Sequence, residues 1–479
     1  MLKRSLATSA KQEFSYHSNY KFKCGLEIHT QLKTKYKLFS LSRTSFNEPS
    51  NTRISYFDIG LPGTQPILNP EALYLALRAS VALNCDVQPI SKFDRKHYFY
   101  PDQPLGYQIT QQFHPLAKNG YLNLTKFDNT AVQGRIHIER VHLEQDTGKK
   151  HGNEIDYNRA GTPLIEVVTK PDFENIDQVL AFVKKYQLLV RYLNVCSGDL
   201  ETGAIRVDVN VNVNNHPRVE LKNLATTGDI VRALQYEYNR QIEVLESGGR
   251  IEQQTRNWDG FSTNLARTKE NAVDYRYFPD CELPPIVLEE NITEDIKSLM
   301  PEYPEDLLKR LTSKPHLLQL VDAKRLIAEP KLLHYYETFF KLYNHPDANK
   351  WIFQEMLTAF AKENKTFDTN IVSSKTLACL ANLNMSLVSK RLVLRYMIRN
   401  DEECLKDALK ALGLEEEQNG ESFSVEDLCR DIINANPKII KRIQSGHIKA
   451  TEVLVGQAIK ATRGKVDADT IRKKFVELL

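Results

Sequence analysis

The 479-residue sequence lacks the features of a membrane, collagen-like or disordered chain. No stretch approaches the roughly 18 uninterrupted apolar residues of a membrane-spanning helix, so no membrane span is expected. Glycine and proline contribute only 20 residues each, which excludes a collagen-like composition. Apolar residues make up 41% of the chain and charged residues 26%, as in ordinary globular proteins. At this length we expect about two to four domains.

Cysteine is scarce and scattered. The seven cysteines form neither CxxC pairs nor the dense framework of a small secreted domain, so we expect reduced thiols in an intracellular compartment. Residues 1–10, MLKRSLATSA, carry two basic residues and two serines, and the first acid is Glu13. This pattern is typical of a mitochondrial transit peptide, which we place at residues 1–19 and which predicts a location in the matrix. The alternative is an ordinary frayed N-terminus.

Neither sign of charge dominates, because the net charge is only +3. A nucleic-acid partner would therefore need a local basic patch. Residues 438–479 supply one, with ten Lys and Arg against four acids. A helical surface of this kind is suited to a phosphate backbone, and the alternative is a merely solvated helix face.

Hydrophobic periodicity divides the chain into two kinds of region. Residues 20–296 combine alternating stretches with helical ones. Residues 205–213, IRVDVNVNV, predict a half-buried strand, and residues 70–83 and 177–193 predict helices. After the prolines at 284 and 285 the pattern becomes helical, for example over residues 348–361, and the polar residues 415–421 separate a last helical segment. The sequence thus predicts an α+β domain over residues 20–296 and helical domains over residues 297–405 and 406–479.

The first candidate functional residues are Glu27 and His29, which share one face of a predicted strand. A carboxylate and an imidazole could face a cation there, although a solvated sheet face is the simpler interpretation of this pair alone. Further acids stand in polar or turn-flanked segments: Glu144, Asp146, Glu166, Glu201 and Asp208.

Several carboxylates converging on one site would repel one another unless a cation neutralised them. Mg²⁺ bound together with nucleotide phosphates fits this need, and Arg206 and Lys222 could then hold the developing charge of a phosphoryl transfer. The sequence has no P-loop, no GxGxxG fingerprint and no kinase HRD or DFG motif. ATP would therefore have to bind on an unusual scaffold.

Two aromatic segments, KHYFYPD at residues 96–102 and DYRYFPD at 274–280, place tyrosines and phenylalanines beside an X-Pro turn. Such rings could stack on an adenine or a terminal base, but an aromatic segment beside a proline more often packs as a structural corner of the fold. No Gly-Ser-rich amidase segment with a paired lysine and no Cys-His-Glu arrangement is evident. A nucleophile that could release ammonia from glutamine is thus not apparent.

Six ordered segments carry a family resemblance. They are GLEIHTQLKT (25–34), KFDRKHYFYPDQPLGYQITQ (92–111), RVHLEQDTGK (140–149), NRAGTPLIEVV (158–168), VELKNL (219–224) and DYRYFPD. From near residue 20 to its C-terminus, the chain resembles the GatB family, the B subunits of tRNA-dependent amidotransferases. The resemblance implies an antiparallel-sheet cradle domain with an ATP-dependent kinase site, an all-α helical domain and a YqeY-like helical tail that holds tRNA.

The resemblance also implies an activity. Such a subunit phosphorylates the glutamate side chain of Glu-tRNA(Gln) with ATP, and ammonia from a partner amidase (A-type) subunit then gives Gln-tRNA(Gln). A small third subunit completes the complex, although its identity and the use of Asp-tRNA(Asn) stay open. The alternative function is a non-catalytic tRNA-binding scaffold.

Site residues follow from the matching motifs. The resemblance implies catalytic roles for Glu27, His29, Glu144 and Glu166, with Mg²⁺ held by Glu27, His29 and Glu144. It leaves open whether Glu144 or Asp146 binds the metal directly. The implied ATP and phosphate-lining residues are Glu201, Arg206, Asp208, Glu220 and Lys222, and the implied tRNA-binding residues are Lys449, Lys460, Arg463 and Lys465.

One departure from the family concerns zinc. Many members carry a cysteine zinc knot at positions that correspond here to Ser40, Ser42, Ser55 and Asp58. Four hard oxygen donors are poor substitutes for thiolates around Zn²⁺, so we predict no zinc.

Overall fold

The computed structural model describes residues 14–45, 47–128, 130–268, 275–414, 425–444, 450–461 and 468–478. The chain divides into two compact units, residues 1–309 and 310–479, where the sequence pattern had suggested a first boundary near residue 296. Each unit is described below by itself.

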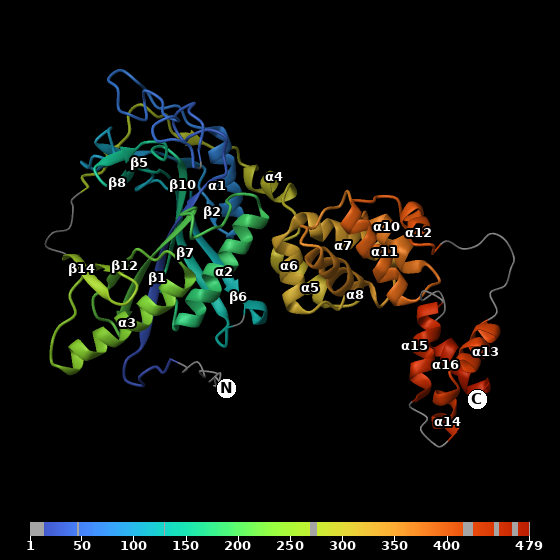
Figure 1. The fold of residues 1–479 in the computed structure, drawn as a ribbon. Helices are drawn as coiled ribbons and strands as arrows, with labels where there is room; N and C mark the ends of the chain where they lie inside the picture. The colour runs from blue at the N-terminus through green and yellow to red at the C-terminus, as the bar shows by residue number, and fades with distance from the viewer. Residues whose placement is uncertain are drawn as a thin grey trace. The chain divides into compact units, whose positions relative to one another are not determined.

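A large sheet forms the centre of the first unit (Figure 1). Within the described residues nine strands join in the order β14-β13-β12-β11-β1-β10-β7-β6-β2. Neighbouring strands are antiparallel, as expected, except β12 and β13, which run parallel. The strands are β1 (Phe22–Gln31), β2 (Asp86–Val87), β6 (Ala117–Leu124), β7 (Gly134–Gln145), β10 (Pro163–Thr169), β11 (Ile205–Val213), β12 (Val219–Lys222), β13 (Gln254–Trp258) and β14 (Thr263–Thr268).

Alternation in the sequence explains the two faces of this sheet. Along β11 every second residue is buried, from Ile205 to Val213, and the residues between them are half-buried. Three helices, α1 (Pro70–Ala82), α2 (Ile176–Tyr192) and α3 (Thr227–Glu246), pack against the strands, with α3 contacting β11 and α2 contacting β6. Because the helices cover the apolar face, the polar residues of the central strands lie on the other face.

Both predicted helices of this unit are confirmed. Pro70 is the first residue of α1, where its missing N–H is not needed, and the Asn69 side chain accepts a hydrogen bond from the Glu71 backbone N–H. Helix α2 begins at Ile176, one residue before the predicted start, because Asn175 caps it by accepting from the Gln178 N–H.

The residues just before β1 belong to the fold as well. The Tyr16 hydroxyl accepts a hydrogen bond from the backbone N–H of Ile176 at 2.7 Å, and the Tyr238 hydroxyl of α3 accepts one from the His17 N–H. Of the leader placed at residues 1–19, residues 1–13 lie outside the described residues, whereas residues 14–19 contact α2 and α3. A leader that ended at residue 19 would include part of this packed segment.

Small sheets border the large one. A three-stranded sheet joins β15 (Phe278–Pro279), β4 (Asp94–His97) and β5 (Tyr107–Thr110), and it brings the two aromatic segments side by side. The His97 and Phe278 rings stack at 5.4 Å, so packing explains part of these segments. The other small pairs are β3 (Ile90–Ser91) with β16 (Ile286–Val287) and β8 (Lys149–His151) with β9 (Glu154–Asp156), and η1 (Lys126–Asp128) is a single 3₁₀ turn.

Helices follow. These are α4 (Ile292–Ser298), α5 (Pro304–Thr312), α6 (Leu320–Ala328), α7 (Pro330–Tyr343), α8 (Ala348–Lys350), η3 (Trp351–Met356), α9 (Leu357–Lys362), α10 (Ser374–Asn382), α11 (Leu387–Asn400) and α12 (Leu405–Ala411). The helix predicted over residues 348–361 is interrupted by η3, a π-helical segment. Glu355 lies in this segment and is 6% exposed, because its carboxylate forms two 2.6 Å hydrogen bonds with Arg391 of α11. Trp351, Met356 and Phe360 of the same stretch are also buried.

The C-terminal helices α13 (Val425–Ala435), α14 (Pro437–Gln444), α15 (Thr451–Ala461) and α16 (Ala468–Leu478) share a hydrophobic cluster of their own, which includes Cys429, Leu454 and Phe475. Of the expected tRNA-binding residues, Lys449, Arg463 and Lys465 lie outside the described residues. Lys460 lies on α15, but the described part of the chain does not include its side chain. The predicted polar separator at residues 415–421 also lies outside the described residues.

All seven cysteines fall within the described ranges, and each is a free thiol. No helix among the described residues is both long enough and apolar enough to span a bilayer.

Candidate active site

Strand register places the polar residues of four strands in one row. His142 of β7 lies opposite Glu166 of β10, Glu166 lies opposite His29 of β1, and His29 lies opposite Arg206 of β11. Directly opposed residues in a sheet point to the same side. Segments far apart in the sequence therefore deliver one acidic and three basic side chains to a single line across the sheet.

Neighbouring rows add more polar groups to the same face. Glu27 lies opposite Asp208, and Asn210 lies opposite Glu220 of β12. Since side chains alternate along a strand, Glu27 and His29 share a face with Asp208 and Asn210. The predicted residues of the central strands therefore converge on the face of the sheet that the helices leave open.

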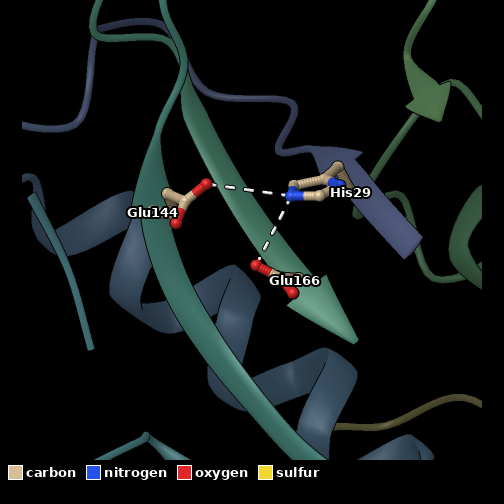
Figure 2. Close-up of side chains that lie close together, drawn as sticks. All are labelled: His29, Glu144 and Glu166. Carbon is tan, nitrogen blue, oxygen red and sulfur yellow. Dashed lines mark ion pairs between the residues drawn. The ribbon is translucent and has the colours of Figure 1, made fainter. Parts of the chain in front are cut away.

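His29, Glu144 and Glu166 form a compact cluster. The His29 Nε2 atom lies 3.4 Å from Glu166 Oε2 and 3.7 Å from Glu144 Oε1. Figure 2 shows the imidazole pointing between the two carboxylates, and one donor atom from each residue falls within 4.8 Å of the others. This is a donor set suitable for a metal ion.

The cluster differs from the expected metal set of Glu27, His29 and Glu144. It includes His29 and Glu144, but its third member is Glu166. The Glu27 Oε1 atom instead accepts a hydrogen bond from the Asn210 side chain at 3.0 Å. Glu27 thus lines the same cavity without joining the three-residue group.

Burial and neighbouring charges shift the pKa values of His29, Glu166 and Glu27. Burial lowers the pKa of His29, but Glu166 and Glu144 outweigh burial and raise it to about 9. Burial opposes ionisation of Glu166, yet His142 and His29 hold its pKa well below the usual range. Glu27 has a raised pKa, because burial is reinforced by the negative charges of Glu166 and Glu220.

The structure adds three residues to the predicted set of catalytic and metal-binding residues. The His142 Nε2 atom lies 3.1 Å from Glu166 Oε2, and its side chain is 3% exposed. The Gln108 amide donates to Glu144 Oε1 at 2.8 Å, and Lys96 Nζ lies 3.9 Å from Glu144 Oε2. The alternation His142, Glu144 was visible in the sequence. The contacts of Lys96 and Gln108 with Glu144 were not visible in the sequence, because only the tertiary fold brings β4 and β5 close to β7.

Two cavities open on this face. The first has a volume of about 390 Å³ and the second about 940 Å³, both within the usual range of ligand pockets. Four residues line both cavities, which therefore adjoin each other: His29, Glu144, Asp208 and Lys222.

The expected phosphate-lining residues divide between the cavities. Glu220 faces the first cavity, where Lys222 Nζ lies 3.0 Å from its carboxylate. Glu201 and Arg206 face the second, and one Arg206 nitrogen lies 2.9 Å from the buried carboxylate of Asp146. Asp208 and Lys222 line both cavities, so four of the five residues meet in the second cavity and only Glu220 does not.

Hydrogen bonds link all four positions that correspond to the cysteine zinc knot. Lys37 Nζ lies 3.0 Å from Asp58 Oδ2, the Ser40 hydroxyl donates to Asp58 Oδ1, and the backbone N–H of Ser55 donates to Asp58 Oδ2. Ser42 contributes its backbone N–H, which donates to Ser40 Oγ. A buried ammonium group thus pairs with the carboxylate, and hydroxyl oxygens replace soft thiolate donors. This donor set does not suit Zn²⁺.

Comparison with known proteins identifies the family. Residues 22–294 match the model described as the GatB/GatE catalytic domain, and residues 334–479 match the one described as the GatB domain. The chain belongs to the GatB/GatE family, as the sequence motifs indicated. It is 65% identical to a Lodderomyces elongisporus protein over 98% of this chain and 93% of that protein. The corresponding identities are 56% for a Candida albicans protein and 45% for a Debaryomyces hansenii protein, with at least 97% of each chain covered. All three relatives carry the name of the B subunit of the mitochondrial glutamyl-tRNA(Gln) amidotransferase.

Proposed function

We propose that this chain is the catalytic B subunit of a mitochondrial glutamyl-tRNA(Gln) amidotransferase, acting in the matrix. The observation that carries this proposal is the His29, Glu144 and Glu166 cluster, which lies between two cavities within the segment that matches the GatB/GatE catalytic domain. The protein works in a complex with an A-type amidase subunit that supplies ammonia and a small third subunit. The basic C-terminal residues, including Lys449, Lys460, Arg463 and Lys465, contact the tRNA backbone.

The proposed reaction has two steps. A γ-carboxylate oxygen of the glutamyl group attacks the γ-phosphorus of ATP, and ADP leaves. Ammonia then attacks the carbonyl carbon of the acyl phosphate, inorganic phosphate leaves, and the glutamine amide is formed. The absence of an evident ammonia-releasing nucleophile in this sequence is consistent with such a division of work between subunits.

Mg²⁺ suits the acidic cluster, because this ion is commonly bound by one or two carboxylates together with substrate phosphates. Glu144 and Glu166 would hold it, with His29 as the third ligand, and the bound ion would neutralise phosphate charge. Lys96 and Lys222 direct positive charge into the first cavity. In both lysines burial lowers the pKa, but neighbouring carboxylates outweigh it and raise the pKa, so both carry a full positive charge at neutral pH.

A scaffold protein that only holds tRNA is the rival function, and a coupled assay separates the two. The complex is assembled with the amidase and third subunits and supplied with ATP, Mg²⁺, glutamine and Glu-tRNA(Gln). We expect tRNA-dependent ATP turnover that Glu144→Gln and Glu166→Gln abolish while tRNA binding persists. Glu139→Gln is the matched control, because Glu139 is an exposed acid on the same strand. A wild-type complex that binds tRNA but turns over no ATP would support the scaffold instead, and full turnover in both cluster variants would contradict the role of the cluster.

A further inference from the structure

We infer that Glu237 of α3 is a positioning residue for the proposed phosphoryl transfer. It lies on the helix-covered side of the large sheet and fixes the β13–β14 hairpin, whose Thr255 side chain holds Glu220 in the first cavity. This inference rests on the proposed function and adds to it a residue that supports the site from the opposite face of the sheet. Because Glu237 is fully buried, it acts through other residues.

Glu237 is an unusual residue for its place in the fold. Helix α3 contacts β11, and most of the buried residues of this helix are apolar, including Ile230, Leu234 and Ile242. Glu237 lies among them and is 0% exposed. A buried carboxylate is costly unless its charge is paired and its oxygens accept hydrogen bonds. The partners of Glu237 therefore show what this carboxylate holds together.

Donors from the helix and from the hairpin surround the Glu237 carboxylate. On the same helix, Arg240 donates to its two oxygens at 2.9 and 2.7 Å, and the Gln241 amide donates to Oε1 at 3.0 Å. The Thr263 hydroxyl of β14 donates to Oε2 at 2.9 Å, and Arg256 Nε of β13 lies 3.6 Å from Oε2. Arg256 Nε also donates to Thr263 Oγ1 at 2.9 Å. The carboxylate thus joins α3 to both strands of the hairpin.

The β13–β14 hairpin depends on this anchor because it forms an edge of the large sheet. Among the described strands β14 is the last, and the hairpin pairs with the rest of the sheet through β12. The pairing of β13 with β14 shifts its register between Thr255 and Arg256. Such an irregularity disrupts the ladder and re-aims side chains. Contacts from outside the sheet therefore fix the direction of Thr255.

Two consecutive residues of β13 carry the link from one face of the sheet to the other. Arg256 lies opposite Leu221, which is 0% exposed, so Arg256 points to the helix-covered face. Thr255 lies opposite Glu220, which lines the first cavity, so Thr255 points to the open face. Because the two residues adjoin in the chain, a displacement of Arg256 also displaces Thr255.

Thr255 holds a charged group of the cavity in place. Its hydroxyl donates to Glu220 Oε2 at 2.7 Å and accepts from Arg267 Nε at 3.1 Å. Another Arg267 nitrogen lies 3.7 Å from the same carboxylate oxygen. The other oxygen of Glu220 lies 3.0 Å from Lys222 Nζ, one of the ammonium groups that direct positive charge into the first cavity. The position of this ammonium group thus depends on Thr255, and through Thr255 on Glu237.

Kinetics of the assembled complex tests the inference with an isosteric variant. Glu237→Gln keeps the shape of the side chain and removes the charge that orients Arg256. The kcat of tRNA-dependent ATP turnover should therefore fall about 10-fold or more, as when the support of a site is lost. The affinity for tRNA, measured by filter binding, should stay unchanged. Glu243→Gln is the matched control, because Glu243 is an exposed acid of the same helix, and it should retain full turnover.

A double-mutant cycle separates positioning from a general loss of stability. Thr255→Val removes the hydroxyl and should lower kcat to a similar extent, whereas Thr255→Ser keeps the hydroxyl and should retain most of the activity. If Glu237 acts through Thr255, Glu237→Gln/Thr255→Val should lose little more than either single variant. Losses in kcat that multiply would show that Glu237 acts independently of Thr255, and the inference would be wrong.

Thr263→Val tests the same link if Glu237→Gln does not fold. It removes the hairpin's hydroxyl from the carboxylate, which keeps Arg240 and Gln241 as partners. It should lower kcat in the same way and show the same lack of additivity with Thr255→Val. Full kcat in a folded Glu237→Gln variant or in Thr263→Val would overturn the inference while the enzyme stays active. A wild-type complex without tRNA-dependent ATP turnover would instead show that the proposed function has failed.

Discussion

Replacing Lys37 by methionine should destabilise the first unit markedly. The Lys37 and Asp58 side chains are 0% and 1% exposed, and their charged atoms lie 3.0 Å apart. Lys37 Nζ also donates to the Tyr157 carbonyl oxygen at 3.2 Å, which ties the segment after β1 to the loop after β9. The substitution keeps the aliphatic stem and removes only the ammonium group, so Asp58 is left as a buried carboxylate without its cation.

The magnitude follows from this burial. Removing one partner of a buried pair costs about 3–5 kcal/mol, because the remaining charge has lost its solvation and its counter-charge. In Lys37→Met, Asp58 keeps the hydrogen bonds from Ser40 and Ser55, which places the loss near about 3 kcal/mol. In Asp58→Asn, the Lys37 ammonium group keeps the Tyr157 carbonyl oxygen and the new amide oxygen as acceptors but loses its counter-charge. The expected loss of stability is therefore nearer to about 5 kcal/mol. With an m-value of about 3 kcal/mol/M, a loss of about 3 kcal/mol lowers the urea midpoint by about 1 M.

Tryptophan fluorescence can measure this loss in the full chain. The sequence has two tryptophans, Trp258 in the first unit and Trp351 in the second. In a Trp351→Phe background, Trp258 alone reports the urea unfolding of the first unit. The matched control is Arg53→Met, because Arg53 and Glu48 form an exposed ion pair in the same segment at 3.1 Å. The control should change stability by at most about 1 kcal/mol.

A double-mutant cycle decides whether the pairing of charges is the cause. Lys37→Met/Asp58→Asn carries no charge at this site, and the asparagine oxygen can still accept from Ser40 and Ser55. We expect the double variant to be more stable than the sum of the two single losses implies, by about 2 kcal/mol or more. Additive losses, or a Lys37→Met variant no worse than Arg53→Met, would refute the reasoning.

Two further predictions concern the site and the N-terminus. His142 holds Glu166 at the cluster, so His142→Leu should reduce transamidation about 10–100-fold and raise the Mg²⁺ concentration needed for half-maximal activity. His142→Gln should partly restore both the transamidation rate and the Mg²⁺ requirement. An unaltered Mg²⁺ requirement in the leucine variant would show that His142 has a purely structural role. The Tyr16 hydroxyl accepts the first N–H of α2 from Ile176, so N-terminal sequencing of the protein from mitochondria should find a start at or before Phe14, and a start at residue 20 would contradict this.

Local sequence pattern determined much of the first unit. The alternation of residues 205–213 predicted strand β11, because a strand buried on one side must alternate apolar and polar residues. Pro70 predicted the start of α1, since proline is tolerated at the first helical position. The family motifs pointed to Glu27, His29, Glu144 and Glu166, all of which face one cavity.

Other features depended on how distant segments meet. The parallel pairing of β12 and β13 is invisible in their sequences, because both strands alternate in the same way whichever direction their neighbour runs. The π-helical turn at Trp351–Met356 coincides with a buried Glu355 whose partner, Arg391, belongs to another helix. A helical period alone cannot show such a partner.

The composition of the site shows the same division. Sequence motifs by themselves determined which carboxylates and imidazoles the protein carries and that the central strands present them on one face, because side-chain direction along a strand is a local property with a period of two. Strand register decided that Glu166, and not Glu27, completes the cluster with His29 and Glu144. The tertiary structure alone separated the two cavities and placed Lys96 beside Tyr275 in one and Arg206 beside Asp146 in the other. These contacts join residues that are remote in the chain, and the local pattern of a strand does not show which remote strand will lie beside it.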